Sequence, residues 1–433
     1  MNDKPARPQP IPFDEALAGL LRHAAPVAAI EEVATLEADG RVLAETVVSP
    51  LSVPDWDNSQ MDGYAVRCSD LVAATDGQPR RLPISQRIPA GRRGTALEPG
   101  TAARIFTGAA LPDGADAVVM QEQAQVQDLD GVPHVSFSHR PAPGEWVRRR
   151  GEDIEAGAAI LAAGTRLTPQ ATGLAASIGA ASLKVFRRLR VACFFTGDEL
   201  VMPGEPLEPG AIYNSNRFLL TALLRRLGCE VLDLGIIGDS LDATRAALRE
   251  AAGRADLIVT SGGMSVGEED HVKPAVEAEG ELTMWQIAIK PGKPLAYGRV
   301  RRGGTSAAGV GGGTGGAGEA AHFIGLPGNP VSSFVTFLMF VRPFVLALQG
   351  AARNAPLRLQ LVAGFDWPRP DRRREFLRVR IEPRTGRLEL FRNQGSAVLT
   401  STVHGDGLLD NPGGQAIREG DVVTYLPFAD LLN

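Results

Sequence analysis

The chain has 433 residues, of which 44% are hydrophobic and 22% charged, a composition typical of a globular protein with two to four domains. Its formal net charge of −5 gives no argument for binding nucleic acid or an anionic membrane surface, and we expect neither partner. The three cysteines are far apart, which excludes a disulfide framework and a zinc-cysteine site.

The first ten residues, MNDKPARPQP, are polar and rich in proline, so we expect no secretory signal peptide there. The most apolar stretch, Phe334 to Leu348, is interrupted by Arg342 and Pro343 and is predicted to be too short to span a bilayer. We therefore expect a cytoplasmic protein.

Apolar residues at helical spacing predict a helix over residues 13–23. Thr168 and Pro169 form a typical start for a second helix, with Gly179 as its stop. Between these helices, residues 80–140 are rich in turns and predict β structure. The sequence thus predicts a β domain inserted between two distant parts of a helical layer.

Residues 54–66, PDWDNSQMDGYAV, carry three aspartates, as a calcium-binding loop would. However, Gln60 and Val66 stand where an EF-hand requires glycine and glutamate, so we reject that interpretation. Taken alone, the stretch favours a hairpin turn at Asp62-Gly63.

Two further polar positions lie in or beside this β region. Thr107 separates a predicted strand from the turn at residues 112–114, and Asp153 ends a run of three arginines, a glycine and two acids. Such charged runs are usually solvated strand ends.

From Arg190 onward, apolar runs alternate with helical patterns, which predicts a doubly wound α/β domain. Ligands of such domains bind beyond the carboxyl ends of the strands. We expect strands at 190–195, 230–234, 255–260, 283–289, 294–298 and 322–326, and helices at 215–227, 241–252, 271–278 and 330–348.

The stretch Ala255 to Asp270, ADLIVTSGGMSVGEED, joins a buried strand to a loop of small residues. Backbone N–H groups in such a loop can converge on a phosphate, and a helix starting near His271 would direct its positive end there. No lysine follows the glycines, which excludes a Walker A loop, whereas the acids before His271 indicate a divalent ion. The alternative is a tight turn with Asp270 as a helix cap, and the stretch alone favours neither. The loop residues are Ser261, Gly262, Gly263, Ser265 and Gly267.

Acids and lysines occupy the loops that follow the expected strands. Because the carboxyl ends of parallel strands meet at one edge, we expect acids for a metal beside lysines for an oxyanion. Only five of the 45 basic residues are lysines, so two lysines three residues apart indicate function, although the alternative is an ordinary exposed turn fixed by prolines. The residues are Glu199, Asp239, Asp270, Lys290 and Lys293.

Residues 301–320 are a glycine-rich insertion in which a GxGxxG match arises by chance, because no strand and helix flank it. We expect a flexible loop there. From about Leu357 the sequence predicts a small C-terminal barrel or sandwich, in which Arg378 and Ser396 are the polar positions of interest.

Five motifs now stand in order: NSQMDGYAV, TGDEL, SGGMSVGEED, IKPGKP and GLPGNPVSS. Together they resemble the molybdopterin molybdenumtransferase family of MoeA proteins and gephyrin E domains, over nearly the whole chain. The resemblance implies a multidomain α/β plus β fold. Its parts would be a discontinuous helical N-terminal domain (11–48 and 147–187), an inserted elongated β domain (49–146), a doubly wound molybdopterin-binding-type α/β domain (188–350) and a C-terminal β-barrel (355–433).

The resemblance also implies an elongated homodimer with its active site between the subunits. The implied reaction inserts molybdenum from molybdate into adenylylated molybdopterin and releases AMP, with Mg²⁺ as cofactor. Implied partners are the molybdopterin adenylyltransferase and proteins that mature molybdoenzymes.

Residues important in the family match eight positions of this chain, which we predict to be catalytic. They are Asp62, Thr107, Asp153, Glu199, Asp239, Asp270, Lys290 and Lys293. We predict that Glu199, Asp239 and Asp270 hold Mg²⁺ and the pyrophosphate, and that the two lysines with Arg378 and Ser396 hold molybdate and the pterin phosphate. The predicted substrate-binding residues are Ser261, Gly262, Gly263, Ser265, Gly267, Pro294, Asn329, Arg378 and Ser396.

Two departures from the family pattern are visible. Gln286 stands where some relatives have lysine, so one cation of the anion site is missing or replaced by an arginine, and the 301–320 insertion is unusual. Two rival functions remain: a molybdopterin adenylyltransferase, which needs only the α/β unit, and a scaffold on the same fold, which would not need the lysines and acids. Molybdate and tungstate are too alike in size and charge for the sequence to separate them.

Overall fold

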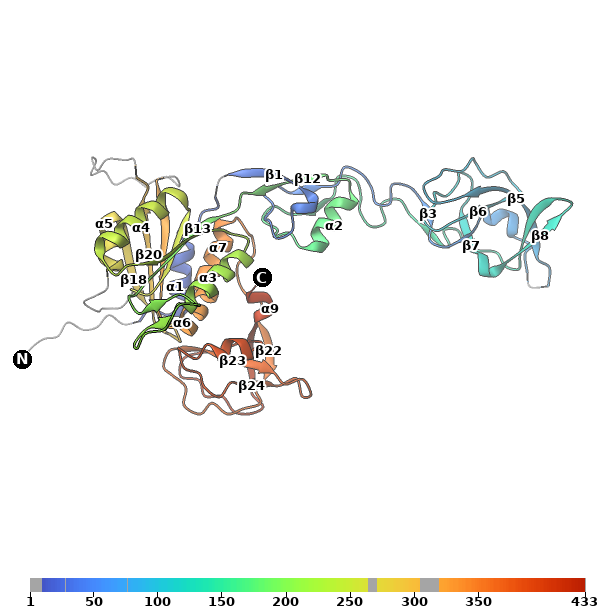
Figure 1. Ribbon diagram of the computed structural model, residues 1–433. Coiled ribbons are helices and arrows are strands. Elements are labelled where there is room, and N and C mark those ends of the chain that lie inside the picture. The colour runs from blue at the N-terminus through green and yellow to red at the C-terminus, as the bar shows by residue number, and fades with distance from the viewer. Residues whose placement is uncertain (1–9, 28, 76, 264–270, 304–318, 433) are drawn as a thin grey trace, which may run out of the picture.

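The computed structural model describes residues 10–27, 29–75, 77–263, 271–303 and 319–432. The molecule is elongated (Figure 1). An α/β domain and a C-terminal β domain lie side by side at one end, and a slender connecting unit leads to a separate β domain at the other end.

The distal β domain is built on one mixed sheet with the strand order β7-β4-β6-β5-β9-β8. Its strands are β4 (Gly63–Val66), β5 (Arg80–Ile88), β6 (Ala102–Ile105), β7 (Ala117–Met120), β8 (Ala124–Leu129) and β9 (Val132–Phe137). The β structure predicted for residues 80–140 is therefore confirmed, and Asp62 stands directly before β4.

The connecting unit pairs chain segments that are about 90 to 155 residues apart in sequence. Its antiparallel pairs are β1 (Ile30–Ala34) with β12 (Ser182–Phe186), β2 (Val47–Val48) with β11 (Ala159–Leu161), and β3 (Asn58–Ser59) with β10 (Val147–Arg148). The predicted second helix is α2 (Pro169–Ser177), whose first turn is capped by the Thr168 hydroxyl, which accepts from Ala171 N at 3.3 Å. Within its described part, this unit is thus more strand than helix.

The α/β domain has a six-stranded sheet in the order β16-β13-β17-β21-β20-β18. The first four strands are parallel, whereas β20 runs antiparallel to both of its neighbours, so the sheet is mixed at one edge. The strands are β13 (Arg190–Thr196), β16 (Glu230–Ile237), β17 (Leu257–Ser261), β18 (Gly280–Gln286), β20 (Pro294–Arg301) and β21 (Ala320–Leu326), with a small pair β14 (Leu200–Val201) and β15 (Ile212–Tyr213) beside them.

Helices cover both faces of this sheet because successive strand residues point to opposite faces. On one face, Cys193 and Phe195 pack in a large core with α1 (Phe13–Leu21), α3 (Ser215–Arg226) and the helix that starts at Pro330. On the other face, Phe194 packs with α4 (Leu241–Arg254) and α5 (Val272–Glu279). Helix α1, which the resemblance grouped with the N-terminal unit, belongs to the first of these cores: its Phe13 ring lies 5.2 Å from Phe340.

The apolar helix over residues 330–348 consists of α6 (Pro330–Thr336), a π-helical turn (Phe337–Val341) and α7 (Arg342–Leu348). The prediction that this region is too short to span a bilayer was wrong on length, because the whole helix has 19 residues with a mean hydropathy of 1.9. Since 94% of it is buried inside the fold, it is placed as a core helix. The π turn ends two residues before Pro343, which has no N–H to donate.

The C-terminal domain has the strand order β19-β23-β25-β26-β22, and β24 pairs with β23. The bridge between Ala363 and Leu388 joins the chain after β22 to β24. The edge strand β19 does not belong to this part of the sequence, because it is the two-residue segment Ile289–Lys290 from the α/β domain. The other elements are β22 (Leu359–Val362), β23 (Arg374–Ile381), β24 (Leu388–Leu390), β25 (Gly407–Asn411), β26 (Val422–Pro427), α8 (Thr400–His404) and α9 (Phe428–Leu431).

Candidate active site

Loops at one edge of the α/β sheet carry most of the predicted site residues. Glu199 and Asp239 follow the parallel strands β13 and β16, Asn329 follows β21, and both lysines lie between β18 and β20. The first two loops touch, because Asp239 N donates to Asp198 Oδ1 at 3.3 Å. The predicted grouping at the carboxyl edge therefore follows from the observed topology, and Asp198, which was not among the predicted site residues, joins two of the loops.

The glycine pair after β17 is required by its backbone. Gly262 and Gly263 have φ values of +100° and +62°, a region that other residues rarely adopt. A Cβ on Gly262 would lie 2.7 Å from Thr196 O, and one on Gly263 would lie 2.5 Å from Val272 Cγ2. The turn thus passes close to the end of β13 and to α5. Ser265, Gly267 and Asp270 lie outside the described residues.

The Ser261 hydroxyl is engaged inside the protein. It is buried, donates to Pro327 O at 2.8 Å and accepts from Asn216 Nδ2 at 2.8 Å. The hydroxyl thus ties β17 to the loop after β21, and substrate binding by Ser261 stays a prediction that depends on its backbone.

Several buried polar atoms at or near this edge have no hydrogen-bond partner among the described residues. Leaving such an atom unsatisfied costs about 1–3 kcal/mol, so their concentration here is a mark of a ligand or water site. Asn216 is informative: its Nδ2 also donates to Gly328 O at 2.7 Å, while its Oδ1 has no partner in the described part of the chain. The atoms are Thr196 Oγ1, Thr260 Oγ1, Asn214 Nδ2 and Asn216 Oδ1. Sequence reasoning missed both asparagines, although Asn214 is a typical N-cap residue at the start of α3.

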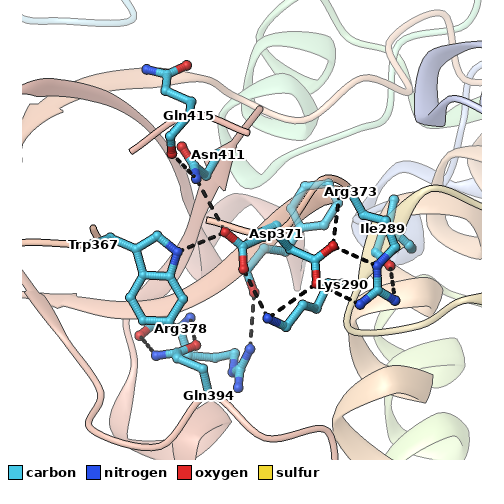
Figure 2. A network of polar contacts seen from close by, with 11 residues as sticks. Ile289, Lys290, Trp367, Asp371, Arg373, Arg378, Gln394, Asn411 and Gln415 are labelled. Atoms are coloured by element: carbon cyan, nitrogen blue, oxygen red, sulfur yellow. Dashed lines mark hydrogen bonds and ion pairs between the residues drawn. The ribbon is translucent and has the colours of Figure 1, made fainter. Parts of the chain in front are cut away.

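Lys290 is not on an exposed turn. Its backbone is a strand of the C-terminal sheet, where Ile289 and Lys290 pair in parallel with Arg374 and Glu375. Its ammonium lies 3.2 Å from Glu375 Oε1 and 3.6 Å from Asp371 Oδ2 (Figure 2). The alternative of an ordinary turn is excluded for Lys290. Lys293, in contrast, is exposed, and Pro294 after it begins β20.

The two carboxylates beside Lys290 differ in their surroundings. Glu375 has no exposed surface and accepts from Trp367 Nε1 at 2.8 Å and from Asn411 Nδ2 at 3.5 Å. Asp371 accepts from Arg373 Nε at 3.0 Å and Nη2 at 2.8 Å, and these bonds hold its pKa well below the usual range. Neither carboxylate was predicted as a site residue.

Arg378 is a buried cation without a carboxylate partner in the described part of the chain. Only 1% exposed, it donates to Ser401 Oγ at 3.1 Å and to the carbonyls of Phe376 and Gly395 at 3.1 and 3.3 Å. Burial lowers its pKa to about 10. An unpaired buried guanidinium favours binding of an anion.

Ser396 connects this region to the α/β domain. It is half-buried next to Gly395, and its carbonyl accepts from Val331 N at 3.0 Å, in the first turn of α6. The predicted residues Arg378 and Ser396 therefore belong to a part of the C-terminal domain that meets the loop of Asn329.

Three predicted catalytic residues lie away from this edge. Asp62 and Thr107 are neighbours, because Asp62 Oδ1 accepts from Thr107 N at 2.8 Å and from Thr107 Oγ1 at 2.7 Å, bonds that lower the pKa of Asp62. Both lie in the distal β domain, and exposed Asp153 lies where the connecting unit begins. Figure 1 shows that the distal domain is far from the α/β sheet of the same chain.

Two of the three predicted magnesium ligands lie within the described residues. In the described part of the chain, no group of three histidine, cysteine, aspartate or glutamate residues is arranged to hold a metal ion. Of the predicted ligands, Glu199 and Asp239 lie at the same edge of the sheet and Asp270 lies outside the described residues.

Comparisons with known proteins cover nearly the whole chain. Residues 11–179 match the family model "MoeA N-terminal region (domain I and II)", residues 192–347 match "Probable molybdopterin binding domain", and residues 360–428 match "MoeA C-terminal region (domain IV)".

Curated relatives and solved structures agree with these matches. A molybdopterin molybdenumtransferase of Haemophilus influenzae is 38% identical, covering 92% of this chain and 93% of its own. Molybdopterin molybdenumtransferase 2 of Mycobacterium tuberculosis is also 38% identical, with coverages of 87% and 89%. Two crystal structures of molybdopterin biosynthesis MoeA protein from Pyrococcus horikoshii match with TM-scores of 0.75 and 0.78 at 31% and 27% identity, covering 97% of this chain and 99% and 100% of theirs.

Proposed function

Because this chain belongs to the MoeA family of molybdopterin molybdenumtransferases, transferases of molybdenum cofactor biosynthesis, we propose that it inserts molybdenum from molybdate into adenylylated molybdopterin and releases AMP. The observation that carries the proposal is the meeting of a glycine turn, acids and lysines at one sheet edge. These are groups for a phosphate, a divalent ion and an oxyanion respectively.

The substrate would lie along this edge. Gly262 and Gly263 would let backbone N–H groups approach the pyrophosphate, and the unpartnered atoms of Asn214 and Asn216 would bind polar groups of the substrate. Lys293, Lys290 and Arg378 would hold molybdate and the pterin phosphate, because all three are cations around the junction with the C-terminal domain.

Mg²⁺ fits the donor set. Glu199 and Asp239 supply carboxylate oxygens, which Mg²⁺ prefers, and this ion is commonly held by one or two carboxylates together with substrate phosphates. When bound, it would withdraw negative charge from the pyrophosphate. The ammonium groups would add to that effect as the bridge between the phosphates breaks, so catalysis would be mainly electrostatic.

We propose that the active protein is a homodimer. The matched residues Asp62 and Thr107 lie in the distal domain, far from the lysines of their own chain (Figure 1). A second copy could bring its distal domain to this edge, as closed two-fold assemblies allow. A cytoplasmic location, contact with the molybdopterin adenylyltransferase and contact with molybdoenzyme maturation proteins are further proposals that follow from the family.

The test is AMP release from adenylylated molybdopterin in the presence of Mg²⁺, with and without molybdate. We expect molybdate-dependent release by the wild type and a loss of about 100-fold or more in Asp239→Ala, since removal of a charge-stabilising group typically costs 10²–10³ in rate. Asp242→Ala removes an exposed acid three residues away and is the matched control. Release that ignores molybdate would indicate a hydrolase, and no release by folded wild type would favour the scaffold function.

A further inference from the structure

We propose that Glu375 is a positioning residue of the oxyanion site: its buried carboxylate fixes the Lys290 ammonium and thereby sets the affinity for molybdate. The inference rests on the proposed function, and it assigns a role to a residue that matches none of the motifs used above.

The burial of Glu375 supports this role. The Glu375 side chain is 0% exposed, whereas that of Lys290 is 39% exposed. A carboxylate removed from water needs a cation and hydrogen-bond donors. Among the described residues, the cation within ion-pair distance of Glu375 is Lys290, at 3.2 Å.

The Glu375 carboxylate is also held in a fixed position. Trp367 Nε1 and Asn411 Nδ2 donate to the other oxygen, Glu375 Oε2, and Asn411 itself donates to Gln415 O at 2.9 Å. The Lys290 ammonium donates instead to Glu375 Oε1, at 3.2 Å. Two donors thus fix Oε2 of the carboxylate, while Oε1 faces the Lys290 ammonium.

A second carboxylate, that of Asp371, competes for the Lys290 ammonium. Asp371 lies 3.6 Å from the Lys290 ammonium, but it is already paired with Arg373 at 2.8 Å. Its charge is therefore largely offset by a neighbour, and Glu375 remains the stronger anchor. Without Glu375, the ammonium would turn towards Asp371 and leave its present position.

A fixed Lys290 ammonium would bind an anion more favourably than a mobile one. An ammonium on a flexible stem loses conformational freedom when it binds an anion, and a preformed position removes part of that cost. Lys290 is held in place before any anion arrives, whereas Lys293 is exposed. One lysine is therefore preorganised and the other is free to close on the oxyanion.

The experiment measures the Kd of the full-length protein for molybdate by isothermal titration calorimetry, together with the KM for molybdate in the AMP-release assay. In Glu375→Gln the Kd and KM should rise about 10- to 100-fold, because displacement of a positioned group by about 1 Å has effects of that size. The kcat at saturating molybdate should change less.

Asp410→Asn is the matched control. Asp410 is also a buried carboxylate of the same sheet, but it pairs with Arg374 and Arg358 and not with Lys290. Its Kd for molybdate should equal that of the wild type. Glu375→Asp keeps the charge and should restore part of the affinity.

Several outcomes would overturn the inference: an unchanged Kd in Glu375→Gln, a lower Kd, which would make Glu375 only a repelling charge, or an equal rise in Asp410→Asn. If Glu375→Gln does not fold, Trp367→Phe decides, since it removes one donor that holds the carboxylate, and its Kd should rise several-fold. If wild type itself neither binds nor uses molybdate, the proposed function fails first.

Discussion

Three arginine side chains, those of Arg187, Arg190 and Arg302, converge on Asp256, at the junction of the connecting unit and the α/β domain. Arg187 makes two hydrogen bonds to it, at 2.7 and 2.8 Å, and Arg190 adds a backbone N–H at 2.9 Å. Burial opposes ionisation of Asp256, but the bonds from the two arginines outweigh it and lower the pKa to about 2. The carboxylate therefore stabilises the fold in its charged form.

We expect Asp256→Asn to lower the free energy of unfolding by about 3 kcal/mol, because it leaves partly buried guanidinium groups without their buried counter-charge. Denaturant titration measures this. Glu250→Gln, which breaks an exposed pair with Arg254, should change stability by less than about 0.5 kcal/mol. The Asp256 contribution should be complete above pH 4 and fade as the pH falls towards 2, since the folded-state pKa lies below the ordinary value.

His322 gives a second pH dependence of stability, because folding disfavours the charged form of this histidine. Burial, with repulsion from Arg299 and His23, lowers its pKa to about 4, and Tyr297 Oη lies 3.0 Å from its Nδ1. Below about pH 6.5 the unfolded chain binds a proton that the folded chain resists, so stability should fall between pH 6.5 and 4 by about 2–3 kcal/mol. His322→Gln should flatten that part of the stability profile, whereas His404→Gln, which replaces an exposed histidine, should not.

At this scale, sequence reasoning identified residue types better than their partners. Asp62 and Thr107 were both singled out, but their mutual hydrogen bonds depend on strand pairing that brings residues 45 positions apart together. Glu375 carried no sequence signal, because a glutamate in an alternating strand resembles any solvent-facing residue until the opposing surface is known.

Among the elements, the glycine turn after β17 is the most constrained part of the site. Gly262 has φ +100° and a blocked Cβ position, whereas Gly204, at φ +99°, has no atom within 4 Å of a Cβ. The two glycines therefore separate the cost of a left-handed backbone from the cost of lost space.

Alanine at either glycine should destabilise the protein by about 1–2 kcal/mol through backbone strain. Gly262→Ala should in addition displace Thr196 or the turn and reduce AMP release more than tenfold, while Gly204→Ala stays near wild type. The measurement is AMP release together with thermal unfolding. Equal activities in the two variants would show that the space around Gly262 is not needed for the chemistry.

The elements that periodicity could predict are those with strong local patterns. Helices α3 and α4 begin at the predicted residues, and all six predicted strands of the α/β domain are present, within a few residues of their bounds. The mixed direction of β20 could not be predicted, because an apolar strand has the same composition in either direction. The two-residue strand β19 was hidden directly before Pro291, where the pattern favoured a turn.

On the scale of the whole molecule, the separation of the distal domain from the α/β sheet makes a shared active site testable. If Asp62 of one chain serves the lysines of the other, Asp62→Ala and Lys293→Ala should each be inactive alone. A refolded one-to-one mixture should regain about a quarter of wild-type activity, because half of the dimers are mixed and each has one intact site. Recovery near zero, with mixed dimers demonstrated by differently tagged chains, would mean that both residues act within one chain or in separate steps.

The elongated architecture was predictable only through the family motifs. Composition indicated several domains but not their arrangement, since nothing in local periodicity records the pairing of β1 with β12 across about 150 residues. The match to solved structures over 97% of the chain supplies what local patterns lack.

Strand β19 comes from the α/β part of the chain but pairs within the C-terminal sheet, and this affects how the protein can be divided into fragments and expressed. A fragment that begins after residue 350 would lack β19, which pairs with Arg374 and Glu375, so the start of β23 would present unpaired N–H and C=O groups there, whereas β24 would still pair with residues 379–381. It would also lack the cation that neutralises Glu375. Such a fragment should aggregate through its open strand edge, and restoring solubility would require supplying Ile289 and Lys290 as a fused segment.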